Sequence, residues 1–164
     1  MNESKKADVS RRSFVKCSAV ASAAALMAKG NLAYAAGSDR FRVAMVGCGS
    51  RGTKDLVECL NSMPGVEVVA LGDMFQDKVD LCMRVLRGGG DKKGAVPAEA
   101  VKVTPETTFL GFDAYEKILA MDEVDLVLFA TPPGFRPAHV KAAVEAGKHI
   151  FMEKPGAVDP VGVR

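Results

Sequence analysis

From Phe41 onward, short apolar runs alternate with segments in which apolar residues recur every three or four positions. An apolar run of this kind predicts a buried strand, whereas the longer repeat predicts a helix that covers one side of a sheet. Strands are expected at residues 41–46, 66–72, 108–109, 124–131 and 149–153. Helices are expected at residues 53–63, 78–86, 113–120 and 137–145. Strands that alternate with helices predict right-handed βαβ units, and therefore an α/β fold with a parallel sheet.

The first predicted strand is followed by the sequence GCGSRG at residues 47–52. A G-x-G-x-x-G motif alone is weak evidence, but here it stands between a strand and a helix, and Asp73 ends the next strand about twenty residues later. This context is the dinucleotide-binding fingerprint of a doubly wound Rossmann sheet. We therefore expect NAD or NADP at this turn. The alternative is a structural glycine turn in a nucleotide-free α/β protein.

The residues of the turn have distinct expected roles. Gly47 permits the tight turn, Gly49 lets the backbone approach a pyrophosphate, and Gly52 lets the helix pack close to the strand. Asp73 can accept hydrogen bonds from the adenosine ribose and would repel a 2′-phosphate, so NAD is favoured over NADP. Arg51 could instead meet a 2′-phosphate, the pyrophosphate or the backbone. The predicted nucleotide contacts in this region are Gly47, Cys48, Gly49, Ser50, Arg51, Gly52 and Asp73.

A second group of motifs lies at two later strand ends, ATP at residues 130–132 and EKP at residues 153–155. Parallel strands end at one edge of the sheet, where Rossmann folds bind their ligand. Together with the glycine turn and EAGKH at residues 145–149, these motifs resemble the Gfo/Idh/MocA family, which includes glucose-fructose oxidoreductase and inositol dehydrogenase. The resemblance covers roughly residues 41–160. The resemblance is specific because ATP at 130–132, EAGKH at 145–149 and EKP at 153–155 occur in the order typical of the family.

The resemblance implies roles for four residues of the second group. Thr131 and Pro132 would lie near the nicotinamide-side ribose or the phosphates, and Glu153 would contact a cofactor ribose. Lys154 would be catalytic, because in the family it hydrogen-bonds the reacting hydroxyl and assists proton transfer. Without the resemblance, Lys154 is more simply a surface residue in a turn. One departure is that Pro133 follows the T-P pair, where many relatives have Asn or His.

The resemblance also implies a second, largely antiparallel α+β domain that carries most of the substrate pocket and a His or Asp acid/base. This chain is expected to stop inside the Rossmann domain, before that second domain. The general acid/base of the second domain therefore has no counterpart among the residues printed here.

The segment before Phe41 has the composition of an export signal. Basic residues precede the apolar, alanine-rich stretch 17–28, which is too short for a stable membrane anchor. The stretch SRRSFVK at residues 10–16 resembles a twin-arginine signal, and cleavage is expected after Ala35. The alternative is a basic first helix of the domain. The predicted organisation is a signal peptide at 1–35, a linker at 36–40 and an incomplete NAD(P)-binding domain at 41–164.

Composition narrows the partners further. The formal net charge is +2, and because basic residues concentrate in the signal segment, the remainder is slightly acidic and offers no footprint for nucleic acid. The 4 cysteines have no C-x-x-C spacing and no neighbouring histidine, so no zinc site is expected. The expected partners are a small carbohydrate or polyol substrate and the twin-arginine export machinery, and a homo-oligomer is compatible with the full-length protein.

Three functions remain open at this point. The first is an exported, periplasmic NAD(P)-dependent oxidoreductase that acts on a sugar or polyol hydroxyl with tightly bound nicotinamide, loaded before export. The second is glycoside cleavage by oxidation, elimination and re-reduction on bound NAD. Relatives with that activity often replace the signature lysine, so Lys154 disfavours it, whereas export favours a cofactor that regenerates itself. The third is an inactive cofactor-binding fragment.

Overall fold

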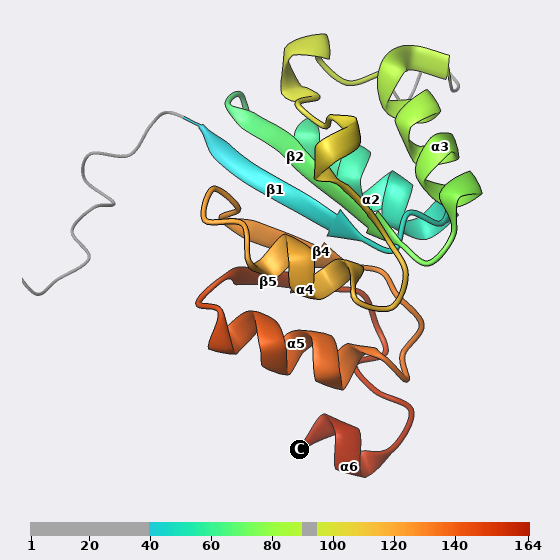
Figure 1. Ribbon diagram of the computed structural model, residues 1–164, viewed down its shortest axis with the longest axis vertical. Helices are drawn as coiled ribbons and strands as arrows, with labels where there is room; N and C mark the ends of the chain where they lie inside the picture. Colours follow the sequence, from blue (N-terminus) through green and yellow to red (C-terminus); the bar gives the residue numbers. More distant parts are fainter. Residues whose placement is uncertain (1–39, 90–94) are drawn as a thin grey trace, which may run out of the picture. The chain divides into compact units, whose positions relative to one another are not determined.

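The computed structural model describes residues 40–89 and 95–164. Five strands form one sheet in the order β3-β2-β1-β4-β5, and each neighbouring pair is parallel (Figure 1). This order, in which β4 adds to β1 on the side away from β2, is that of the first five strands of a doubly wound Rossmann fold, with the topological switch point between β1 and β4. The predicted fold class is thus confirmed. The strands are β1 (Phe41–Val46), β2 (Val66–Asp73), β3 (Thr108–Leu110), β4 (Leu126–Phe129) and β5 (His149–Met152).

Helices cover both faces of the sheet (Figure 1). The α-helices are α2 (Ser50–Leu60), α3 (Gln76–Arg84), α4 (Ala114–Leu119), α5 (Arg136–Glu145) and α6 (Pro160–Val163). A π-helical turn follows α3, and two 3₁₀ turns precede β3. These short turns are η2 (Val85–Gly89), η4 (Ala98–Ala100) and η5 (Pro105–Thr107).

The core consists of two apolar clusters, one on each face of the sheet. Val43 and Met45 of β1 pack with Leu56 of α2 on one face, whereas Ala44 of β1 packs with Ile118 of α4 on the other. All five side chains are fully buried. Alternate residues of β1 therefore face opposite helix layers, which is why the strand reads as a continuous apolar run.

Helix α2 begins and ends three residues earlier than the apolar repeat predicts. The amide of Thr53 already donates to the Gly49 carbonyl at 2.9 Å, so the second half of the glycine motif is the first turn of the helix. At the other end the Asn61 side chain donates to the Val57 carbonyl at 3.0 Å and caps the helix. Met63, expected on the buried face, lies beyond the helix and is exposed.

Strand β4 is shorter than the predicted range 124–131. Before it, Asp125 bonds Arg42 of β1 twice, because its carboxylate accepts a hydrogen bond from the Arg42 amide at 2.8 Å and its own amide donates to the Arg42 carbonyl at 2.9 Å. After it, the Ala130 amide still donates to the Val46 carbonyl at 3.0 Å. The chain then turns away at Thr131, which brings the ATP motif to the edge of the sheet.

Within residues 40–89 and 95–164, no helix has the length and apolar character needed to cross a membrane. The predicted signal segment, its cleavage site after Ala35 and residues 36–39 of the predicted linker lie outside the described residues.

Candidate functional site

The predicted site residues meet at the carboxyl edge of the sheet. The Gly47 amide donates to the Gly72 carbonyl at 2.8 Å, which holds the glycine turn beside the end of β2. The Glu153 amide donates to the Phe129 carbonyl at 3.0 Å, which holds the EKP motif beside the end of β4. The glycine turn, Asp73, the ATP motif and the EKP motif therefore line one edge, as the sequence predicts.

Two glycines of the turn are required by the protein's own packing. Gly47 has φ +99°, and a Cβ there would lie 2.8 Å from the Thr131 amide nitrogen. A Cβ on Gly52 would overlap both the Gly47 carbonyl oxygen and Met45 Cε. These glycines let α2 and residues 130–131 approach β1, so neither position 47 nor position 52 has room for a larger residue.

Gly49 is different, because no neighbour among the described residues requires a glycine there. Its φ of −65° and ψ of 179° suit any residue, and a Cβ there would meet no heavy atom within 4 Å. Helix α2 starts at the next residue and has no acidic side chain in its first turn. Open space in front of a helix N-terminus, with free N–H groups and partial positive charge, fits a pyrophosphate.

Asp73 fastens the turn to the end of β2. Its Oδ2 accepts a hydrogen bond from the Cys48 amide at 2.6 Å, and its Oδ1 accepts one from the Phe75 amide at 3.0 Å. The carboxylate is half-buried, so part of it stays open beside the turn. It is thus held in place where an adenosine ribose is expected to bind.

Cys48 holds the turn from within. Its side chain is fully buried and donates to the Gly72 carbonyl at 3.6 Å, and its own carbonyl accepts a hydrogen bond from Thr53 Oγ1 at 3.1 Å. Contact with the Cys82 thiol and burial raise the pKa of the Cys48 thiol. With its amide on Asp73, each polar group of Cys48 is bonded inside the protein. A nucleotide contact from this residue stays a prediction.

Arg51 joins the glycine turn to the EKP motif. Its guanidinium donates to Glu153 Oε1 through Nε at 2.9 Å and through Nη2 at 2.5 Å, and Nε lies 3.0 Å from Asp55 Oδ1. The hydrogen bonds from Arg51 lower the pKa of Glu153. Glu153 Oε2 accepts a hydrogen bond from the Lys154 amide at 3.1 Å. The Arg51 side chain, expected at a phosphate or the backbone, is therefore directed toward two carboxylates.

Sequence reasoning missed Asp55. Its side chain is only 7% exposed, and Oδ2 is buried without a hydrogen-bond partner among the described residues. Burial raises the pKa of this carboxyl, although Arg51 acts in the opposite direction. The available signal was a carboxylate four residues after Arg51, one position before the buried Leu56.

Two residues of α5, neither of them predicted as part of the site, hold the Ala-Thr-Pro motif at residues 130–132 in place. His139 Nδ1 lies 3.1 Å from Thr131 Oγ1, and its ring packs on Tyr115 with centroids 4.3 Å apart. Burial lowers the pKa of His139, which favours the neutral ring. Arg136, whose side chain is buried, donates to the Thr131 carbonyl at 2.8 Å. Thr131 is thus held at its hydroxyl and at its carbonyl.

Comparison with known proteins agrees with this geometry. Residues 41–163 match the sequence profile of GFO_IDH_MocA, an oxidoreductase family with an NAD-binding Rossmann fold. The chain belongs to the Gfo/Idh/MocA oxidoreductase family. Its described body is therefore an NAD(P)-binding Rossmann domain. Residues 8–28 match the signal sequence of the twin-arginine translocation pathway, which indicates export.

Curated relatives in this family carry the name glycosyl hydrolase family 109. One from Phocaeicola vulgatus is 31% identical over 72% of this chain and 20% of its own length. Another from Streptomyces niveus is 35% identical over 71% of this chain and 21% of its own length. The chain thus spans about a fifth of the length of these relatives.

Solved structures share the fold at lower identity. Scyllo-inositol dehydrogenase from Lactobacillus casei, solved with NAD(H) and scyllo-inositol, is 19% identical with a TM-score of 0.56, over 76% of this chain and 31% of that one. Myo-inositol dehydrogenase from the same organism, in complex with NAD(H) and myo-inositol, is 24% identical with a TM-score of 0.56, over 75% and 31%. These likenesses show the same Rossmann architecture.

Lys154 lies at the edge of the sheet with an exposed side chain. Its backbone is fixed on both sides, because Arg136 Nη1 donates to the Glu153 and Pro155 carbonyls at 2.5 Å each. The Lys154–Pro155 peptide bond is cis. The Lys154 ammonium group is therefore free to reach a ligand while the Lys154 backbone stays in place.

Pro132, which follows the end of β4, is also exposed, and its carbonyl accepts a hydrogen bond from the Phe135 amide at 3.1 Å.

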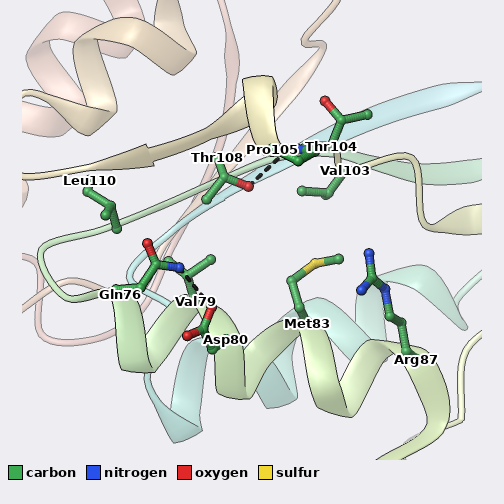
Figure 2. A pocket seen from close by; sticks show the side chains of 10 residues that line it. All are labelled: Gln76, Val79, Asp80, Met83, Arg87, Val103, Thr104, Pro105, Thr108 and Leu110. Atoms are coloured by element: carbon green, nitrogen blue, oxygen red, sulfur yellow. Dashed lines mark hydrogen bonds between the residues drawn. The ribbon is translucent and has the colours of Figure 1, made fainter.

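A separate groove of about 330 Å³ lies between α3 and the segment 103–110 (Figure 2). No residue of the predicted site lines it. Its polar groups are partly paired with one another, since Gln76 donates to Asp80 at 2.7 Å and Thr108 donates to the Thr104 carbonyl at 3.0 Å (Figure 2). The groove therefore adds nothing to the nucleotide site.

Proposed function

We propose that this chain is the cofactor-binding part of an exported oxidoreductase that acts on a sugar or polyol hydroxyl with tightly bound NAD(P). The observation that carries the proposal is the open space at Gly49 in front of α2, beside the half-buried Asp73. In a turn where Gly47 and Gly52 serve packing, Gly49 alone is accounted for by a ligand. A pyrophosphate is the group that such a helix N-terminus accepts.

The residues at the end of β1 and β2 would hold the adenosine half. Backbone amides from Gly49 to Gly52 would face the pyrophosphate, and Asp73 would accept hydrogen bonds from the ribose hydroxyls. The Asp73 carboxylate already bonds two amides, so its position is fixed and its charge opposes a 2′-phosphate. NAD is accordingly the preferred cofactor, with NADP the alternative.

The residues at the end of β4 and β5 would serve the reacting half. Thr131 and Pro132, after β4, would border the nicotinamide-side ribose, and Glu153, after the neighbouring strand β5, would contact that ribose. The nicotinamide, when bound, accepts or returns hydride at a substrate carbon. Lys154 would hydrogen-bond the reacting hydroxyl through Nζ, and in its neutral amine form it would accept the hydroxyl proton as the hydride leaves the substrate carbon.

A second candidate is glycoside cleavage without net oxidation, and the family 109 glycosyl hydrolase names among the relatives favour it. Export also favours it, because a cofactor that is restored within each catalytic cycle needs no external pool. Lys154 argues for net alcohol oxidation. The two candidates differ in one readout: a full-length protein that contains this domain either reduces NAD with a free sugar or releases the aglycone of a glycoside without added nucleotide.

The nucleotide proposal itself is tested on this chain. Calorimetry should show NAD binding, and Asp73→Ala should weaken it by about tenfold or more, since a charge-assisted hydrogen bond contributes about 1.5 to 3 kcal/mol. Asp77→Ala is the matched control, because Asp77 lies four residues away on an exposed part of α3. Equal NAD affinity in the wild type and Asp73→Ala would contradict the assignment of Asp73.

We also propose that residues 1–35 are removed on export, residues 36–40 form a linker, and residues 41–164 form the nucleotide-binding domain of a periplasmic protein. The support is the twin-arginine match at residues 8–28. Mass spectrometry of the exported protein should give a mature N-terminus at Ala36. A chain that keeps its first 35 residues after export would overturn the cleavage site.

A further inference from the structure

The guanidinium of Arg136 is buried where the ends of β4 and β5 meet. Only 5% of the residue is exposed. Nε donates to the Thr131 carbonyl at 2.8 Å, and Nη1 donates to the Glu153 and Pro155 carbonyls at 2.5 Å each. One side chain therefore bonds the backbone before and after Lys154 and the backbone of Thr131.

Burial of this cation is costly unless its donors are satisfied. The ion pairs found among residues 40–89 and 95–164 do not include Arg136, so carbonyl dipoles balance its charge. An apolar side chain could fill the same space without this cost. A lysine carries its donors at one point, whereas the planar guanidinium directs donors along fixed, separate lines. The planar guanidinium of Arg136 therefore bonds the backbone after β4 and the backbone after β5 at the same time.

Arg51 and Arg136 act on different parts of the same motif. Arg51 bonds the Glu153 carboxylate from the glycine turn, whereas Arg136 bonds the backbone carbonyls that flank Lys154. The Arg51 side chain is 59% exposed, so water can compete for its bonds. Arg136 is shielded from water, and it therefore determines the backbone geometry at Lys154 more strictly.

We propose that Arg136 is a positioning residue that fixes Thr131 and Lys154 relative to each other, so that the nicotinamide half of a bound nucleotide meets both. The inference rests on the proposed function, because it takes these two residues as contacts of that half. Arg136 itself touches neither nucleotide nor substrate. Its loss would release the EKP turn from the ATP segment while the glycine turn and Asp73 stay in place.

The test compares NAD with ADP, which contains the adenosine and pyrophosphate groups but lacks the nicotinamide riboside. Calorimetric titrations of this chain use the wild type, Arg136→Met, Arg136→Lys and the control Arg84→Met, which removes an exposed arginine of α3. In Arg136→Met, NAD affinity should fall about tenfold, the scale of one lost hydrogen bond to a charged group. ADP affinity should stay within about twofold, and Arg84→Met should change neither.

A second readout follows the backbone amides by ¹H–¹⁵N NMR. In the wild type, NAD should shift the Thr131, Lys154 and Gly49 amides. In Arg136→Met, the Thr131 and Lys154 responses should be lost and the Gly49 response kept. Arg136→Lys can still donate to one carbonyl, so its NAD affinity should lie between those of the wild type and Arg136→Met.

The possible failures are distinguishable. If the wild type binds neither NAD nor ADP, the proposed function fails. If the wild type binds both, and the variants lose them equally or lose neither, Arg136 is not a positioning residue. Circular dichroism establishes that each variant is folded. If neither Arg136 variant folds, the residue is purely structural and the inference is overturned as well.

Discussion

The two halves of the candidate site are built in different ways. At the end of β1, shape dominates: Gly47 and Gly52 let backbone segments approach, and Gly49 leaves space. At the end of β5, charge dominates, because Arg51 and Arg136 hold Glu153 and the backbone around Lys154. The difference teaches that the glycine turn depends on an accurately shaped backbone, whereas the turn that carries Lys154 depends on side chains that converge from distant elements.

Burial follows the same division. Residues 43–46 of β1 are buried, and the strand lies between helix layers on both faces. Three of the four residues of β5 are exposed, including Phe151 and Met152. A buried frame tolerates no added atoms, so substitutions near β1 should act through overlap. Substitutions near β5 should act through lost bonds and should depend on pH.

The largest effect should come from Gly52→Ala, which tests the shape-dominated half. The added methyl group would overlap the Gly47 carbonyl oxygen and Met45 Cε. Overpacking of this kind lowers the free energy of unfolding by about 3 kcal/mol. Urea unfolding followed by circular dichroism should show this loss. Gly134→Ala is the control, because a Cβ there meets no heavy atom within 4 Å. A loss no larger than that of the control would remove the steric argument for Gly52.

The next effect separates binding from folding within the same turn. Gly49→Ala adds the same methyl group where it meets nothing, so stability should change by no more than about 1 kcal/mol, the scale of an N-cap substitution. The methyl group would occupy the space proposed for the pyrophosphate, and calorimetry should show NAD and ADP affinities lower by about tenfold each. Loss of NAD binding alone would move Gly49 to the other half of the site and break the comparison.

The shape-dominated half could be predicted from sequence, for a physical reason. The glycine motif and Asp73 lie within 27 residues of each other, and their spacing follows from one strand–turn–helix–strand unit. The strands at 41–46 and 66–72 were accordingly found almost to the residue. The ends of α2 and β4 were not, because the Asn61 side chain caps α2 and the chain turns away from β1 after Ala130.

The charge-dominated half could be predicted only in part. The EKP and ATP motifs indicated where the strands end, and the family resemblance supplied the roles of their residues. The roles of Asp55, Arg136 and His139 were missed. Asp55 stands four residues after Arg51, so its signal was local, whereas the bonds from Arg136 to the Glu153 and Pro155 carbonyls join residues 17 and 19 apart in the sequence. Arg51 and Glu153 are 102 residues apart in sequence, and only the assembled sheet brings them together.

The smallest effect, a change in how stability depends on pH, tests the charges around Arg51. Burial raises the pKa of Asp55 above its ordinary value of 3.8, so the folded protein binds this proton more tightly than the unfolded chain. The contribution is favourable below that ordinary value and is lost as the pH rises through the raised pKa. Asp55→Asn removes this term. Relative to the wild type, the variant should therefore gain stability as the pH rises above 3.8, until the Asp55 carboxyl is ionised in the folded protein as well.

Glu153→Gln should give the opposite sign in a different range. The Arg51 bonds lower the pKa of Glu153 from its ordinary value of 4.5, so its contribution is complete above that value and is lost as the pH falls through the lowered pKa. Relative to the wild type, Glu153→Gln should thus lose stability as the pH rises toward 4.5. Urea unfolding at a series of pH values measures both differences. If the stability difference between Asp55→Asn and the wild type did not change with pH, burial would not hold the Asp55 proton more tightly in the folded protein. The ion pairs of Arg51 with Asp55 and Glu153 would then stabilise the folded chain no more than ordinary surface pairs do.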